Sequence, residues 1–346
     1  MRIARYLKIQ LLALDRRFLV PFFSRHPWLA SLYYVVVSQK FGREHKAVLS
    51  GRNRYHASLR NPADTCFLLR RNTHRLEKGL IMRPRRDVFA LDYIEETVNQ
   101  YAVCKELNAV TETELQWVHD VLSDYFACVA SSPVIEKARV AFQQCPNEAE
   151  AYQAWVPYES GARAPLSTDY EAFFELCRRR RSVRWYDGRA VPRDLLEQAV
   201  EAAAQAPSAC NRQPFRFSIF DNPEDAAKVG AITNGTAGFS QNFSCLIVVV
   251  GDLSAYPFER DRHLIYVDAS LASMQLMLAL ETLGLSSCPI NWPDIEVMER
   301  GLAEVLNLSY HERPIMLISV GYPDPKGNIP FSQKKSSDSM IRWQSL

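Results

Sequence analysis

The chain has 346 residues, 47% of them hydrophobic and 23% charged, with a formal net charge of +2, which is the composition of a globular protein with a sizeable core. Its eight cysteines form no C-x-x-C pair, which argues against a zinc site and against a disulfide framework and favours a cytoplasmic location. The longest apolar stretch, residues 264–283, carries Asp268 and Glu281 and therefore predicts a buried helix, not a membrane span.

The charge is distributed unevenly along the chain. Residues 1–60 hold twelve Lys and Arg against Asp15 and Glu44, a net charge of +10, whereas the remainder carries −8. Within this basic head, apolar residues share one helical stripe while basic residues lie on other faces; the stripe is Ile3, Leu7, Leu11, Leu14 and Phe18, and the basic residues are Arg2, Arg5, Lys8 and Arg16.

Such an amphipathic head fits two kinds of partner. It could lie on an anionic membrane surface, with Trp28, Tyr33 and Tyr34 as interfacial anchors, so that a cytoplasmic protein becomes membrane-associated. It could equally pack on its own chain or on a second subunit. A nucleic-acid partner is not expected, because no recognition motif accompanies the basic residues.

The first part of the chain is predicted to be mostly helical. Residues 87–107 and 111–130 both show helical spacing, and Thr111 followed by Glu114 forms a capping box at the start of the second. The segment "WVPYESGARAPLSTD" (155–169) is rich in Pro, Gly and Ser, which indicates a boundary. We therefore expect a helical region over 1–155, a linker over 156–169 and a second domain over 170–346.

The second domain alternates helical and β-rich segments. Helices are expected from Pro192 or Arg193 to Pro207, over 263–283 and over 295–306, and strands over 215–221, 245–252 and 313–322. The run "CLIVVVGD" is apolar enough to be an interior strand. Helices and interior strands that interleave in this way predict an α/β or α+β fold in which helices cover a sheet.

An arginine-rich segment, "RRRRSVRWYDG" (178–188), opens this domain. It is either a solvated basic cap or a phosphate site, because guanidinium groups and a hydroxyl donate hydrogen bonds to phosphate oxygens. Two further segments follow: "APSACNRQPFRF" (206–217), in which a helix turns into a strand, and "SSCPINW" (286–292), after the long helix.

In this order and spacing the three segments resemble the nitroreductase family of FMN-dependent oxidoreductases, over about residues 170–346. The resemblance implies an α+β fold with a nitroreductase-like sheet covered by helices, preceded here by the helical region. It also implies that FMN is bound by Arg180, Arg181, Ser182 and Arg184, and by Pro207, Ser208 and Asn211 of the turn. Asn211 offers a donor and an acceptor to the flavin ring edge, and Gln213 is expected to brace the turn.

The resemblance further implies that a loop faces the reactive flavin N5; this loop is Cys288, Pro289, Ile290 and Asn291. Cys288 is expected to line the pocket and not to act as a nucleophile. A basic tail residue returns to the phosphate, with Lys335 preferred over Lys334, and Asn242 is a candidate for the pyrimidine edge. No side chain is assigned a catalytic role of its own, and no metal is expected.

The activity that follows from the resemblance is hydride transfer from NAD(P)H through FMN to a small organic acceptor, in a homodimer with flavin at the subunit interface. No G-x-G-x-x-G follows a strand, so a separate nicotinamide site is not expected. Two alternatives stay open. One is a substrate-specific flavin dehydrogenase or oxidase whose pocket or lid is the helical region. The other is a membrane-surface interaction protein that keeps a vestigial flavin fold.

Overall fold

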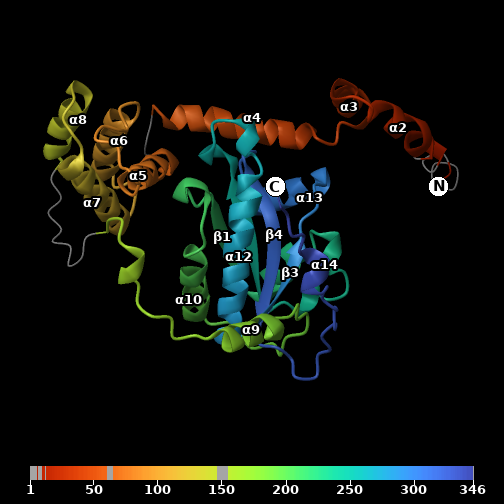
Figure 1. Ribbon diagram of the computed structural model, residues 1–346. Helices are drawn as coiled ribbons and strands as arrows, with labels where there is room; N and C mark the ends of the chain where they lie inside the picture. The colour runs from red at the N-terminus through yellow and green to blue at the C-terminus, as the bar shows by residue number, and fades with distance from the viewer. Residues whose placement is uncertain (1–5, 7–9, 12, 61–64, 146–154, 346) are drawn as a thin grey trace.

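The computed structural model describes residues 6, 10–11, 13–60, 65–145 and 155–345. Figure 1 shows a sheet with helices on its faces, one long helix (α4) across one end of the sheet, a cluster of helices beyond one end of α4, and a helical arm beyond the other. The described part of residues 1–155 is largely helical, as predicted; its helices are α2 (Val20–Phe23), α3 (Pro27–Tyr33), α4 (Gly42–Ser58), α5 (Phe67–Leu80), α6 (Ile94–Glu106), α7 (Glu112–Cys128) and α8 (Pro133–Gln143).

Helices α5 to α8 enclose a core of their own. Leu69, Leu76, Tyr101 and Leu122 are fully buried in it. Thr111 caps α7 as predicted, since its hydroxyl accepts a hydrogen bond from the backbone N–H of Glu114 at 3.3 Å, whereas the Glu114 carboxylate accepts from Arg70 at 2.6 Å. The helix expected over 87–107 begins only at residue 94, after a turn in which Ala90 has a left-handed backbone (φ 64°).

Helix α4 is fixed to the second domain at several points. A Cβ atom on Gly51 would lie 2.8 Å from backbone atoms of Leu253, so only glycine permits this close approach. Arg43 donates two hydrogen bonds to Glu296, at 2.6 and 2.8 Å. The helical region is therefore attached directly to the sheet domain.

The arm that precedes α4 leaves its apolar side chains exposed. Leu11, Leu14 and Phe18 of the predicted stripe expose 66%, 51% and 57% of their surface, and Trp28 exposes 66%. Ile3, Leu7 and the basic residues Arg2, Arg5 and Lys8 lie outside the described residues. The described part of the stripe is thus not covered by its own chain.

The sheet has four antiparallel strands in the order β1-β2-β4-β3; they are β1 (Phe215–Phe220), β2 (Cys245–Asp252), β3 (Ser286–Asn291) and β4 (Glu312–Gly321). Strand β2 is interior, as predicted. Ile247 and Val249 pack towards α10 and α12, whereas Leu246 and Val248 pack towards α11 and α13. Both faces of the sheet are covered, which confirms the α+β fold; the remaining helices are α9 (Tyr170–Arg179), α10 (Arg193–Ala204), α11 (Pro223–Gly230), α12 (Leu264–Thr282), α13 (Glu296–Leu306) and α14 (Ser337–Met340).

The segment "SSCPIN", expected to be a loop, is instead strand β3, which pairs with β4 along its whole length. Within the described part of the chain, one helix is long and apolar enough to cross a membrane, namely α12 together with the turn before it. It packs against α10 and the sheet, as expected for the core helix of this domain.

Candidate active site

The arginine-rich segment lies beside β3, at the end of the sheet that α9 covers. Ser182 forms a parallel bridge with Ser287, and the backbone N–H of Val183 donates to the Ser287 carbonyl at 3.1 Å. The buried hydroxyl of Tyr186 donates to the Val183 carbonyl at 2.9 Å and so holds the segment in place. The amide of Asn242 donates to the Arg184 carbonyl at 3.0 Å, so Asn242 braces this segment.

The fixed segment forms a basic hollow of about 80 Å³. It is lined by Arg180, Arg181, Ser182, Arg184, Pro330, Ser332 and Lys334. Among the described residues, the buried Nε of Arg180 has no hydrogen-bond partner. A buried donor without a partner, beside other cations and a hydroxyl, suits an anion such as a phosphate. Lys334 lines the hollow and Lys335 does not, so the preference for Lys335 has no support from the structure.

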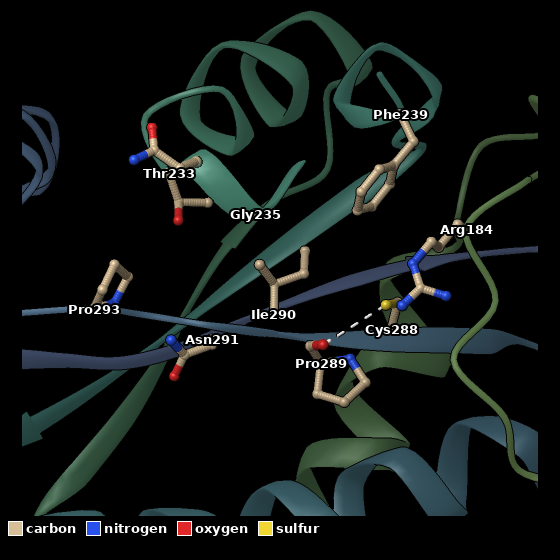
Figure 2. Close-up of a pocket in the computed structure, with 10 residues that line it drawn as sticks. Arg184, Thr233, Gly235, Phe239, Cys288, Pro289, Ile290, Asn291 and Pro293 are labelled. Carbon is tan, nitrogen blue, oxygen red and sulfur yellow. Dashed lines mark hydrogen bonds between the residues drawn. The ribbon is translucent and has the colours of Figure 1, made fainter. Parts of the chain in front are cut away.

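Figure 2 shows a second, larger pocket of about 450 Å³. It adjoins the hollow, because Arg184 lines both. Its other lining residues are Thr233, Asn234, Gly235, Phe239, Cys288, Pro289, Ile290, Asn291 and Pro293. The four predicted residues of β3 thus lie together at one pocket. No motif in the sequence points to residues 233–235, although "TNGTAGF" is a glycine-containing loop of the kind that approaches ligands closely.

Cys288 is almost fully buried in this pocket wall. Burial raises the pKa of the Cys288 thiol, an effect that nearby Arg184 only partly opposes. A thiol with a raised pKa stays protonated at neutral pH and is a poor nucleophile. This agrees with the prediction that Cys288 lines the pocket and does not react.

The turn that carries Pro207, Ser208 and Asn211 lies at the opposite end of the sheet, near α4. β1 begins there, with Phe215 opposite Gly251, whereas Ser287 pairs with Val320 at the far end. The hydroxyl of Ser208 accepts from the backbone N–H of Gln213 at 3.0 Å, in line with the bracing role expected of Gln213. One chain therefore does not bring this turn to the basic hollow.

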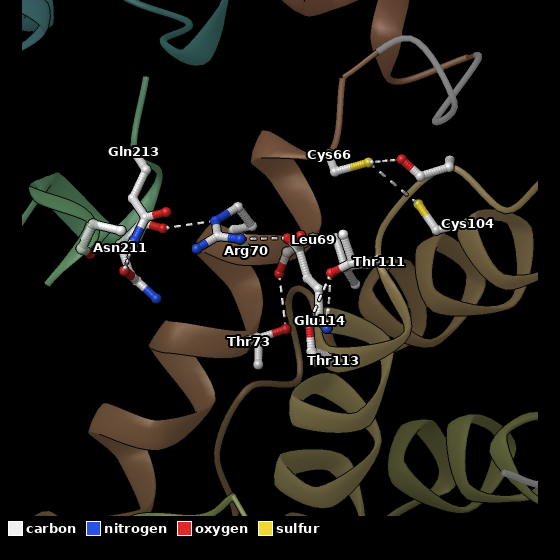
Figure 3. Close-up of polar contacts among 12 residues, drawn as sticks. Cys66, Leu69, Arg70, Thr73, Cys104, Thr111, Thr113, Glu114, Asn211 and Gln213 are labelled. Carbon is white, nitrogen blue, oxygen red and sulfur yellow. Dashed lines mark hydrogen bonds and ion pairs between the residues drawn. The ribbon is translucent and has the colours of Figure 1, made fainter. Parts of the chain in front are cut away.

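The turn contacts the helical region through Arg70 of α5 (Figure 3). The Nε of Arg70 donates to the carbonyl oxygen of Asn211 at 3.0 Å, and its Nη1 donates to Glu114 at 2.6 Å. The sequence carries no motif that marks Arg70, because the contact joins residues 141 positions apart.

Comparison with known proteins identifies the second domain. The family model described as "Nitroreductase family" matches residues 177–242 and 231–322. A "Putative NADH dehydrogenase/NAD(P)H nitroreductase" of Archaeoglobus fulgidus is 33% identical over 147 residues, which cover 42% of this chain and 81% of the relative. Iodotyrosine deiodinase 1 of Mus musculus is 24% identical over 230 residues, covering 56% of this chain and 78% of the relative.

Among solved structures, an FMN-dependent nitroreductase of Clostridium difficile is 22% identical and matches with a TM-score of 0.43, over 50% of this chain and 99% of that one. The family model falls within the domain that holds the basic hollow, the pocket and the turn. The chain belongs to the nitroreductase family, a family of flavin-dependent oxidoreductases.

Proposed function

We propose that residues 170–346 bind FMN and catalyse electron transfer from NAD(P)H to a small organic acceptor. The observation that carries the proposal is the bridge between Ser182 and Ser287, which sets the basic hollow beside the pocket of β3. The hollow suits the phosphate of FMN, and the adjoining pocket suits a ring system that extends from it. FMN supplies the hydride chemistry when bound.

The residues of this chain hold and orient the cofactor in this proposal. Arg180 and Lys334 offer cationic donors to the phosphate, and Ser182 a hydroxyl. Arg184 lies where the hollow meets the pocket, within reach of both the phosphate side and the ring side. The backbone of β3 forms the wall against which the ring would lie.

A second copy of the chain would complete the site. The turn with Ser208 and Asn211 lies at the far end of the sheet, so its polar groups need another chain to meet the basic hollow. Helix α12 exposes an apolar stripe on which a second copy could pack; it consists of Val267, Leu271 and Met274, which are 51%, 44% and 38% exposed. These features support a homodimer with flavin between the subunits.

The first experiment is the absorbance spectrum of the purified protein, before and after anaerobic addition of NADH or NADPH. Bound flavin that bleaches supports the proposed reductase. Flavin that stays oxidised with both nicotinamides argues for a different electron donor. A colourless protein that takes up no added FMN would refute the proposal. The exposed arm, as a membrane-interaction segment, would then be the next feature to test.

A second candidate is a substrate-specific flavin enzyme, to which the helical region contributes a wall or lid. It is favoured by the contact between α5 and the turn, which places the helical region at one proposed flavin-binding element. The similarity to iodotyrosine deiodinase makes halogenated phenols the first substrates to try. Turnover of such phenols at least tenfold faster than of simple nitroaromatics, with reduced FMN in both assays, would support this candidate, and equal rates would count against it.

A further inference from the structure

The turn between α10 and β1 is held in an unfavourable backbone conformation. Cys210, Asn211 and Gln213 have φ angles of 54°, 51° and 50°, a left-handed region that asparagine adopts occasionally and other non-glycine residues adopt rarely. Such a conformation persists only when the surroundings enforce it. The contacts that enforce it therefore decide where the side chain of Asn211 points.

Part of the enforcement comes from the sheet domain itself. The carboxylate of Asp268 accepts a hydrogen bond from the backbone N–H of Ala209 at 3.0 Å. Arg212 is buried, with its guanidinium 4.9 Å from the ring centre of Tyr256. These contacts hold both sides of the turn, but neither reaches the carbonyl oxygen of Asn211.

That carbonyl accepts its hydrogen bond from Arg70, on the helical region. The guanidinium of Arg70 is itself held in place, because Glu114 accepts from it at 2.6 Å and the ring centre of Trp117 lies 5.7 Å away. The side chains of Arg70 and Glu114 are only 18% and 17% exposed. A fixed charged donor on a carbonyl makes a stronger hydrogen bond than a neutral donor does.

We infer that Arg70 is a positioning residue for the flavin: it holds the Asn211 peptide so that the Asn211 amide presents a donor and an acceptor to the flavin ring edge. The inference rests on the proposed function, and it makes the helical region part of the flavin site. It also predicts that the basic hollow determines the binding of the phosphate, whereas Arg70 determines the binding of the ring.

The test compares three variants with the wild-type chain. Arg70→Met removes the donor and should weaken FMN binding about tenfold, the change expected on losing one charge-assisted hydrogen bond. Arg70→Lys keeps a charged donor and should recover part of the loss. Glu114→Gln breaks the ion pair but leaves the bond to Asn211, so its FMN affinity should stay within about threefold of wild type.

The matched control is Arg75→Met, on the same helix. Arg75 contacts Asp92 at 3.3 Å and stacks on Tyr93, and neither residue belongs to the turn. Arg70→Met leaves the largely buried Glu114 unpaired and should unfold at a lower temperature than Arg75→Met, so FMN binding is measured well below both unfolding temperatures, where only Arg70→Met should lose FMN affinity. Riboflavin, which lacks the phosphate, should show the same tenfold loss, because the affected contact is to the ring.

Each outcome has one meaning. Equal FMN affinity of Arg70→Met and wild type overturns the inference but leaves the proposed function intact. Equal losses in Arg70→Met and Arg75→Met also overturn it, because Arg70 would then act only through stability. A wild-type chain that binds no FMN at all refutes the proposed function itself, and the inference falls with it.

Discussion

The two ends of the sheet are built in different ways. The basic end joins two segments of the sheet domain, since the arginine-rich segment pairs directly with β3. The turn end joins the sheet domain to the helical region, through Arg70 and through the close packing of α4 at Gly51. The basic end is therefore formed within the sheet domain, whereas at the turn end a segment of the family match contacts a helical region outside that match.

The largest effect should follow from damage to the basic end. The double substitution Arg180→Ala and Arg184→Ala removes two cationic donors, and we expect FMN binding to weaken by about 1000-fold, from roughly 2 kcal/mol for each charged hydrogen bond. Isothermal titration of the apoprotein with FMN measures this. Arg178→Ala, an exposed arginine at the end of α9, is the control and should bind like wild type. A loss below tenfold in the double variant would mean that the phosphate lies elsewhere.

The next effect concerns the need for a second chain. Leu271→Glu places a charge on the exposed apolar stripe of α12 and should convert a dimer into a monomer, because burying an unpaired carboxylate is costly. Light scattering gives the mass, and the flavin content should fall at least about tenfold with it. Val297→Glu on α13, where the side chain is 65% exposed, should change neither quantity. A monomeric wild-type chain that retains full flavin would contradict the two-chain site.

A smaller effect should follow from loosening the turn end alone. Gly51→Val forces β-carbon and methyl groups against the backbone of Leu253 and should cost about 1–3 kcal/mol of stability. Because α4 leads into α5, we expect FMN affinity to fall by about threefold as well. Chemical unfolding and titration with FMN measure the two changes. Gly161→Val meets open space and is the control, and equal stability of the two variants would show that α4 does not pack as described.

The smallest effect concerns a carboxyl group under the basic end. Glu281 accepts from Ser286 at 3.0 Å and lies 3.4 Å from Arg179, and burial raises the pKa of its carboxyl. The folded chain thus holds this proton more tightly than the unfolded chain does. The resulting stabilisation is present at low pH and is lost as the pH rises through the folded pKa.

Glu281→Gln cannot titrate, so its stability relative to wild type should increase between pH 4 and pH 7. Chemical unfolding at both pH values measures the difference. Glu304→Gln, at an exposed position of α13, is the control. A relative stability of Glu281→Gln that falls over this range would show that the paired arginine, and not burial, dominates the ionisation of Glu281.

Most of the sheet domain could be predicted from its sequence, because buried strands and helices leave periodic patterns. The apolar run of β2 predicted an interior strand, and both of its faces are indeed covered. β3 was missed because Pro289 cannot donate a backbone hydrogen bond; the strand tolerates it at the edge of the sheet, where β4 is its neighbouring strand and the bridge to Ser182 lies at Ser287. Local sequence does not reveal an edge position.

The candidate site was predictable only in part, because sequence motifs do not show how distant segments pack together. The motifs selected part of the lining of the basic hollow and of the pocket, but they did not show that the turn lies at the other end of the sheet. The register of the tail was also ambiguous, since two lysines are adjacent and only Lys334 lines the hollow. The role of Arg70 could not be predicted from the sequence, because it depends on how α5 packs against a turn 141 residues away.

Helix α4 has a consequence for how the protein meets its surroundings. Its 17 residues span about 25 Å at 1.5 Å per residue, and they connect the exposed arm to the helical cluster (Figure 1). Because α4 is packed against the sheet domain, both its length and its direction relative to the sheet are fixed. Whatever surface captures the arm would therefore set the orientation of the whole molecule, and with it the direction from which reactants approach the pocket.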